Sequence, residues 1–303
     1  MLKSIKVLLL LAATTVSAAD DNPFVNTDIF ELEVAANPQI SPDGSQIVYA
    51  RRSMDVMTDR SVSSLWIVDA DGTNHRPLLS GNTSYDGQAW SPGGDRLAYV
   101  KSVEGRGPQI HVLWLASGRS GALTNLRHTP ANLSWSPDGK QIAFTMFVPR
   151  EASPLATPPE KPKDAEWAPP VTVIESVQYR GDGAGYLDTG DTHIFVLSAD
   201  GGTPRQVTSG EYNHSGRIAW TPDSKTLVFS ANRQDDWIFD PGESELWSVD
   251  IASGELTQLT DRDGPDFAPA ISPDGSKIAY IGFDDRKMGY HSRQVLIMDR
   301  QSG

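Results

Sequence analysis

The chain of 303 residues contains no cysteine, so disulfides, a cysteine nucleophile and thiolate metal sites are all excluded. Histidine is also scarce, and no two histidines have a His-x-x-x-His spacing. His111 and His193 fall in predicted strands, where structural imidazoles are expected, and the other four fall in predicted loops. We therefore expect no metal site and no cofactor.

The sequence also lacks the Gly-x-Ser-x-Gly motif in which hydrolases expose a nucleophilic serine on a sharp turn. The nearest approach, GRSG at 118–121, has the wrong spacing. We expect no catalytic residue in this chain.

Basic residues are in the minority, with 26 lysines and arginines against 39 acidic residues and a formal charge of −13. This balance argues against nucleic acid and anionic membranes as partners, because phosphates require a basic surface.

One apolar run stands at the start of the chain. Lys3 and Lys6 precede the apolar residues 7–13, and small residues follow at 16–18, a pattern typical of a secretory signal peptide over residues 1–19. A buried N-terminal strand is the alternative. No later stretch reaches the roughly 18 apolar residues of a membrane span. We expect a periplasmic or secreted protein that makes no membrane contact after the signal peptide is cleaved.

A five-fold repeat dominates the rest of the sequence. The copies read ISPDG at 40–44, WSPGG at 90–94, WSPDG at 135–139, WTPDS at 220–224 and ISPDG at 271–275. Each copy lies between two apolar runs, and a third and usually a fourth run follow, so each repeat predicts four short antiparallel strands. A period of about 45–50 residues is typical of a β-propeller blade.

The fold class is therefore predicted as all-β, an incomplete propeller over residues 28–303. The predicted blades lie near 38–80, 86–126, 131–209, 216–261 and 267–303, and the fifth lacks its fourth strand. A short helix capped by Thr27 should precede the first blade. Trp90, Trp135 and Trp220 occupy one equivalent position and should pack between blades. The aspartates of the repeated motif should serve turn formation.

The third repeat carries a long insertion at 148–190. Seven of the 21 prolines fall between residues 149 and 170, which predicts an extended, exposed loop. Trp167 and the apolar residues 171–174 suggest that its second half packs on another part of the protein. A functional lid and a loop without function are both open. Asp182, Asp188 and Asp191 invite a calcium site, but the order of acidic residues in an EF-hand is absent and a solvated loop is favoured.

One dense polar cluster stands outside the repeat, in the loop of the fourth blade. Arg233, Asp235 and Asp236 could bind a substrate, with a carboxylate holding an ammonium group. A solvated acidic loop is the alternative.

These features together resemble the N-terminal propeller of prolyl oligopeptidase family serine peptidases, in the branch of acylaminoacyl and dipeptidyl peptidases. The resemblance rests on the Ser-Pro-Asp-Gly blades, FELEV at 30–34, SANR at 230–233 and Asp236-Trp237. It implies a propeller that limits access to short peptides and a C-terminal α/β-hydrolase domain as its partner. No residue of a Ser-Asp-His triad can be transferred to this chain. The repeat alone also resembles TolB, which leaves a non-enzymatic periplasmic binding propeller as the alternative.

Overall fold

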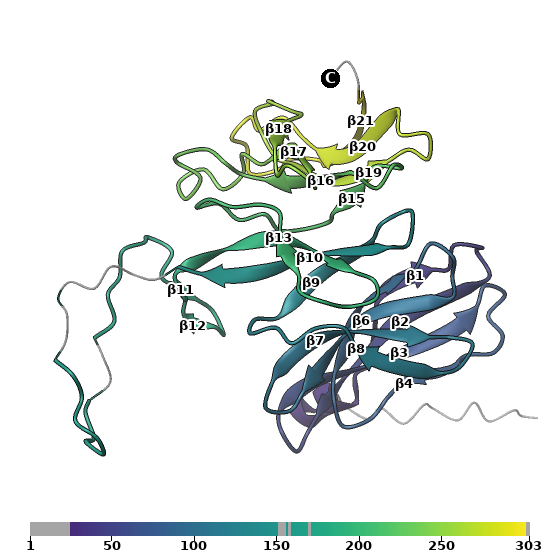
Figure 1. The fold of residues 1–303 in the computed structure, drawn as a ribbon, viewed down its shortest axis with the longest axis horizontal. Coiled ribbons are helices and arrows are strands. Elements are labelled where there is room, and N and C mark those ends of the chain that lie inside the picture. The colour runs from purple at the N-terminus through teal and green to yellow at the C-terminus, as the bar shows by residue number, and fades with distance from the viewer. Residues whose placement is uncertain (1–24, 151–155, 157–158, 169–170, 301–303) are drawn as a thin grey trace, which may run out of the picture.

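The computed structural model describes residues 25–150, 156, 159–168 and 171–300, and it confirms the all-β class. Figure 1 shows its antiparallel sheets following one another in sequence order, as expected for successive blades. In the described residues, the first four blades have four strands each and the fifth has three. The predicted signal peptide lies outside the described residues.

The strands of each blade are as follows. Blade one consists of β1 (Val34–Ile40), β2 (Gln46–Asp55), β3 (Arg60–Asp69) and β4 (Arg76–Leu79). Blade two consists of β5 (Tyr85–Trp90), β6 (Arg96–Val103), β7 (Gly107–Trp114) and β8 (Arg119–Ala122). Blade three consists of β9 (Pro130–Trp135), β10 (Gln141–Pro149), β13 (Gly190–Ser198) and β14 (Arg205–Gln206). Blade four consists of β15 (Ala219–Trp220), β16 (Thr226–Ala231), β17 (Glu245–Asp250) and β18 (Leu256–Gln258), and blade five of β19 (Asp266–Ile271), β20 (Lys277–Gly282) and β21 (Gln294–Asp299).

The repeated motif forms the tight turn between the first two strands of each blade, as predicted. In blade one the Gly44 amide donates to the Ser41 carbonyl at 2.9 Å, and Gly44 has a φ of 74°, which favours glycine. Ser224 takes the same left-handed conformation in blade four, with a φ of 59°. The Asp43 carboxylate accepts from the Ser41 hydroxyl at 2.6 Å and from the Ser45 amide at 3.1 Å. The aspartates therefore serve turn formation, as predicted.

The turn of blade two departs from this pattern because Gly93 replaces the aspartate. Asp95, two residues later, supplies the missing carboxylate, and the Ser91 hydroxyl donates to it at 2.9 Å. The hydrogen bond is thus conserved in position although the sequence motif is broken.

A bulge recurs in the first strand of several blades, three residues before the last residue of that strand. Asn37, Gly87, Asn132 and Ala268 occupy this place with φ between 51° and 62°. A bulge bends the strand and increases its twist.

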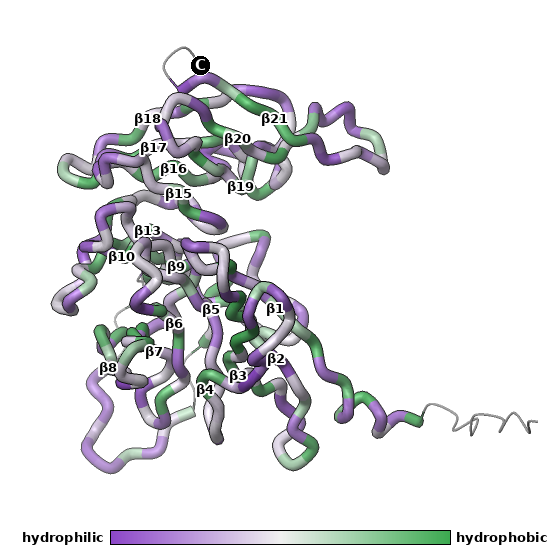
Figure 2. Tube along the Cα trace, turned by 90° about the vertical axis from the view of Figure 1, so that its right-hand side faces the viewer, coloured by the Kyte–Doolittle hydropathy of each residue, from purple (hydrophilic) through white to green (hydrophobic). Residues whose placement is uncertain are grey.

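The hydrophobic core lies between successive blades rather than at one centre. Leu65 of blade one and Tyr99 of blade two share one cluster, and Ile194 of blade three and Phe229 of blade four share another. Figure 2 shows the hydrophobic segments gathered in the strands of the sheets. Each blade is therefore stabilised chiefly by its neighbours.

The three equivalent tryptophans, in blades two, three and four, each form a hydrogen bond to the preceding blade, which confirms that they pack between blades. The indole N–H of Trp90 donates to the Gln39 carbonyl at 3.1 Å, that of Trp135 to Ala89 at 3.0 Å, and that of Trp220 to Ser134 at 3.1 Å.

The segment before blade one is a 3-10 helix, η1 (Asn26–Glu31), so the predicted cap is wrong. Thr27 lies inside the helix, and the capping contact is from the Val25 amide to the Asp28 carboxylate at 2.8 Å.

The described part of the insertion carries a small hairpin, β11 (Arg180–Gly181) and β12 (Gly185–Tyr186), and residues 159–168 lie well away from the sheets (Figure 1). The expectation that Trp167 and residues 171–174 are packed is wrong, because Trp167 is 46% exposed, Val171 85% and Ile174 51%. The flanking strands pair further than predicted, since Pro149 is opposite Gly190.

Candidate functional site

The blades have two chemically different ends. The turn end carries the repeated motif, and the loop end carries the connection between the second and third strands of each blade, which includes the insertion. No helix in the described residues is long and apolar enough to cross a membrane.

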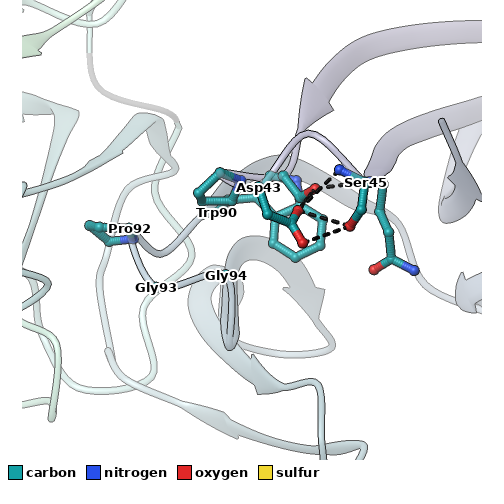
Figure 3. Close-up of a pocket in the computed structure, with 9 residues that line it drawn as sticks. Asp43, Ser45, Trp90, Pro92, Gly93 and Gly94 are labelled. Carbon is teal, nitrogen blue, oxygen red and sulfur yellow. Dashed lines mark hydrogen bonds between the residues drawn. The ribbon is translucent and has the colours of Figure 1, made fainter. Parts of the chain in front are cut away.

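A cavity of about 350 Å³ lies at the turn end, between the first two repeated turns (Figure 3). It is lined by Asp43, Ser45, Trp90 and the Pro92–Gly94 turn, among others. The Asp43 carboxylate is occupied by the hydroxyls and amide of its own turn, which lower its pKa to about 2. Because these polar groups already bond one another, this cavity is part of the blade structure.

A larger cleft of about 650 Å³ lies at the loop end, between blade three, its insertion and blade four. Its apolar wall includes Phe147, Tyr186, Leu187, Trp237 and Ile238. Its polar residues include Arg150, Glu175, Asp188, Asp191, Glu211 and Asn213. Because four carboxylates and only one guanidinium line the cleft, it favours a ligand with a positive charge. Its apolar wall favours a ligand that also carries apolar groups.

Asp191 is the buried polar group of the cleft, with only 5% of the residue exposed. Its carboxylate lies 3.6 Å from the Arg150 guanidinium, which also forms an ion pair with Glu211. Burial raises the pKa of Asp191, and the Arg150 charge opposes that rise. Asp191 is desolvated, and its neighbour Arg150 also pairs with Glu211. The Asp191 carboxylate can therefore accept a hydrogen bond from a donor group of a ligand.

A chain of three side chains, two buried histidines and the half-buried Arg233, lies beside the cleft. The Arg233 Nη1 atom donates to His214 Nε2 at 2.6 Å, and the His193 and His214 Nδ1 atoms are 3.2 Å apart. Because arginine can only donate, His214 carries its proton on Nδ1 and donates it to His193. Burial is the largest cause that lowers the pKa of His214, to about 3, and Arg233 adds to it.

The candidate residues from the sequence do not converge as one group. Arg233 turns inward, while Asp235 and Asp236 are exposed in their own loop, and no ion pair in the described residues joins Arg233 to them. Asp240, from the same loop, instead contacts Lys287 of blade five at 2.9 Å.

His214 lies in a loop, as predicted, and its side chain is completely buried there. Its contact with His193 joins residues 21 apart, and neither spacing nor composition indicates it. Asp188 and Asp191 of the suggested calcium set line the cleft, and no group of three or more possible metal ligands is present in the described residues.

A pair of buried carboxyl groups lies between blades four and five. Glu245 is 4% exposed and accepts from the Thr260 hydroxyl at 2.5 Å, and Asp266 is completely buried, 3.5 Å from Arg262. Burial raises the pKa of Glu245 to about 7 and also raises that of Asp266.

Comparison with known proteins finds similar sequences among peptidases and among TolB proteins. Residues 163–281 match the model of the dipeptidyl peptidase IV (DPP IV) N-terminal region. The uncharacterized peptidase YuxL of Bacillus subtilis is 28% identical over 68% of this chain, and dipeptidyl-peptidase 5 of Porphyromonas gingivalis is 23% identical over 98% of it. The matches span only 30% and 46% of those two proteins.

Solved structures confirm the fold. The Pyrococcus horikoshii acylaminoacyl peptidase covers 89% of this chain with a TM-score of 0.63 at 14% identity, and this chain covers 38% of it. A putative TolB from Agrobacterium tumefaciens covers the same share with a TM-score of 0.56 at 22% identity, and 79% of that chain is covered. The predicted resemblance to peptidase propellers, with TolB-like repeats, is confirmed.

Proposed function

We propose that this chain is the substrate-gating propeller of an exported serine peptidase that acts on short peptides, and that it is not itself catalytic. The match to dipeptidyl-peptidase 5 over nearly the whole chain supports the peptidase assignment. The missing Gly-x-Ser-x-Gly motif supports a division of labour, in which a C-terminal α/β-hydrolase domain supplies the catalytic serine.

The observation that carries the proposal is the cleft at the loop end. Its aromatic and aliphatic wall suits the side chains of a peptide, and Asp191 suits an ammonium group. The insertion forms one wall, so its position determines the width of the entrance. Arg233, Asp235 and Asp236 remain proposed substrate-binding residues, on the loop that also supplies Trp237.

The test uses the protein encoded by the complete reading frame. We expect it to hydrolyse chromogenic dipeptidyl or acyl-aminoacyl substrates. Trp237→Ala and Asp191→Asn should change the ratio of kcat/KM between a dipeptide and a decapeptide substrate, because a gate alters how substrates reach the catalytic groups. Met57→Ala is the matched control, since Met57 is 86% exposed in the corresponding loop of blade one. An unchanged ratio in both cleft variants would contradict gating.

A non-enzymatic propeller of the TolB kind is the second candidate, favoured by the share of the solved TolB structure that the chain covers. The reading frame after residue 303 separates the two candidates. A hydrolase sequence with Gly-x-Ser-x-Gly favours the peptidase, and a stop codon within about one blade, ~45 residues, favours the scaffold.

We also propose a periplasmic or secreted location, on the basis of the apolar segment at 7–13. Cell fractionation and N-terminal sequencing test this proposal. We expect the mature protein to begin after Ala18 or Ala19, and an intact N-terminus in a cytoplasmic fraction would contradict it.

A further inference from the structure

Arg233 is held in place at the loop end, two residues after the end of β16. Its guanidinium lies over the ring of Tyr212, 4.6 Å from the centroid, and over that of Trp247 at 5.3 Å. The contact with His214 fixes a third side of the group. A planar group that contacts two rings and a histidine is restricted in orientation, which favours recognition of a planar ligand.

The neighbours of Arg233 do not neutralise its charge. His214 accepts a hydrogen bond from Arg233 and is therefore neutral, and His193 is neutral because it accepts from His214. Arg233 takes part in none of the ion pairs found among the described residues, in a chain that has 13 more acidic than basic residues. Burial lowers the pKa of Arg233, which is the sign of an uncompensated, partly desolvated cation.

Blade one shows a related arrangement, in which the arginine lies inside the second strand instead of after it. Arg51 stacks on Trp66 at 4.5 Å, and Trp66 and Trp247 occupy equivalent places, opposite Tyr49 and Phe229 respectively. There the Arg51 Nε atom donates to the Glu33 carboxylate at 2.9 Å, and Nη2 contacts the same carboxylate. In blade one a carboxylate thus completes the stacked arginine.

The Nη2 edge of Arg233 faces an exposed glycine. A Cβ atom built on Gly210 would lie 3.9 Å from Nη2, and Gly210 itself is exposed. The cleft is close by in the chain, since Glu211 precedes Tyr212 and Trp237 follows Arg233 by four residues. The loops that hold Arg233 in place therefore also supply part of the cleft wall.

We propose that Arg233 binds a carboxylate of the peptide ligand, either its C-terminal carboxylate or that of an acidic side chain. The inference rests on the proposed peptide-binding function. The guanidinium supplies two parallel N–H donors to the two carboxylate oxygens, which gives both charge and shape selectivity.

The experiment measures binding to the purified chain by isothermal titration calorimetry at low ionic strength. The ligands are Phe-Ala as the free acid, the same peptide as its amide, and Phe-Glu amide, all with a free N-terminal ammonium group for the acidic cleft. We expect at least one carboxylate-bearing peptide to bind about tenfold more tightly than Phe-Ala amide, the effect of one charge-assisted contact. Which of the two binds tightly identifies the source of the carboxylate.

Variants make the assignment specific. Arg233→Gln should abolish the preference for a carboxylate, and Arg233→Lys, which keeps the charge but loses the planar fork, should lose most of it. Arg51→Gln is the matched control and should keep the full preference, because Glu33 already occupies Arg51. If Arg233→Gln does not fold, Arg233→Lys and the ligand series still decide the question.

Two results would overturn the proposal. The first is equal affinity for the acids and the amide in the wild-type chain, or no binding of any of them. The second is a preference that survives in both Arg233 variants. The proposed Arg233 site and the proposed gating function can fail separately. If this chain prefers carboxylate-bearing peptides but the complete protein hydrolyses no peptide, the Arg233 site stands and the gating function is rejected.

Discussion

The two ends of the same sheets use their charged residues in opposite ways. At the turn end, Asp43, Asp138, Asp223 and Asp274 each accept hydrogen bonds from within their own turn, and their pKa values are lowered. At the loop end, Asp191, Glu245 and Asp266 are buried and their pKa values are raised. Turn-end carboxylates thus stabilise the fold locally, whereas the charged forms of the loop-end carboxylates are disfavoured by desolvation.

The difference follows from how each end is built. A repeated turn has the same local bonds in every blade, so a five-residue motif determines it completely. The loop end is formed by connections of different length, and its contacts join separate blades. We therefore infer that the repeated turns contribute mainly to stability, and that the connections that differ between blades determine ligand specificity.

The largest expected effect separates the tryptophans of the two ends. Trp135 is 7% exposed, donates to Ala89 and lies under Arg96, whereas Trp167 of the insertion is 46% exposed. Trp135→Ala should lower the free energy of unfolding by about 3–5 kcal/mol, and Trp167→Ala by less than about 0.5 kcal/mol. Urea unfolding measures both. Equal effects would show that the insertion is part of the core and would remove the distinction between the ends.

The sequence could predict the turn end because its interactions are local. The turns, the strand order and the packing of Trp90, Trp135 and Trp220 follow from residues close together in the repeat. The sequence could not predict the buried contact of His214 with His193 or the orientation of Arg233, because these join different connections through the register of β13 and β16. The broken motif in blade two has a signal that could have been found, since Asp95 lies two residues beyond Gly93.

The prediction that the apolar residues of the insertion are packed is wrong for a physical reason. Apolar residues such as Val171 and Ile174 normally predict burial, but here the described segment lies over a cleft and leaves them exposed. Exposed apolar residues beside a cleft are more typical of a binding surface than of a core.

The next largest effect is on how stability depends on pH, which should differ between the carboxyl groups of the turn end and those of the loop end. Glu245 has a pKa of about 7 in the folded state against the usual 4.5 of a glutamate, so its carboxyl keeps a proton in the folded state that the unfolded chain releases. Its stabilising contribution is therefore present below about pH 4.5 and is lost as the pH rises to about 7. The turn-end carboxylates act in the opposite sense, because Asp43 and Asp274, with pKa values of about 2, stabilise above pH 3.8 and lose that contribution as the pH falls.

Glu245→Gln isolates the loop-end part. Blade two already contains this arrangement, since Gln109 accepts from the Thr124 hydroxyl at 3.0 Å just as Glu245 accepts from Thr260. The variant should therefore fold and should gain roughly 1 kcal/mol of stability at pH 7.5 but not at pH 4.5. Thermal melting across this range measures the gain. A parallel shift at every pH would indicate a packing effect and would reject the titration of Glu245 as its cause.

The smallest expected effect comes from shortening the insertion. Replacing residues 151–168 by a short Gly/Ser linker, while keeping Arg150 and its pairs with Asp191 and Glu211, should change the melting temperature by less than about 2 °C, because the described part of this segment is exposed. In the complete protein the same change should alter the preference between short and long peptides, because the segment leads directly into residues 172–179, which line the cleft. A matched replacement of residues 56–59 in blade one, a loop of similar exposure but away from the cleft, should leave that preference unchanged. If shortening the insertion lowers stability strongly, its apolar residues contribute to the core. If neither stability nor length preference changes, the gate is formed by the loop of blade four, and Trp237 becomes the residue on which access depends.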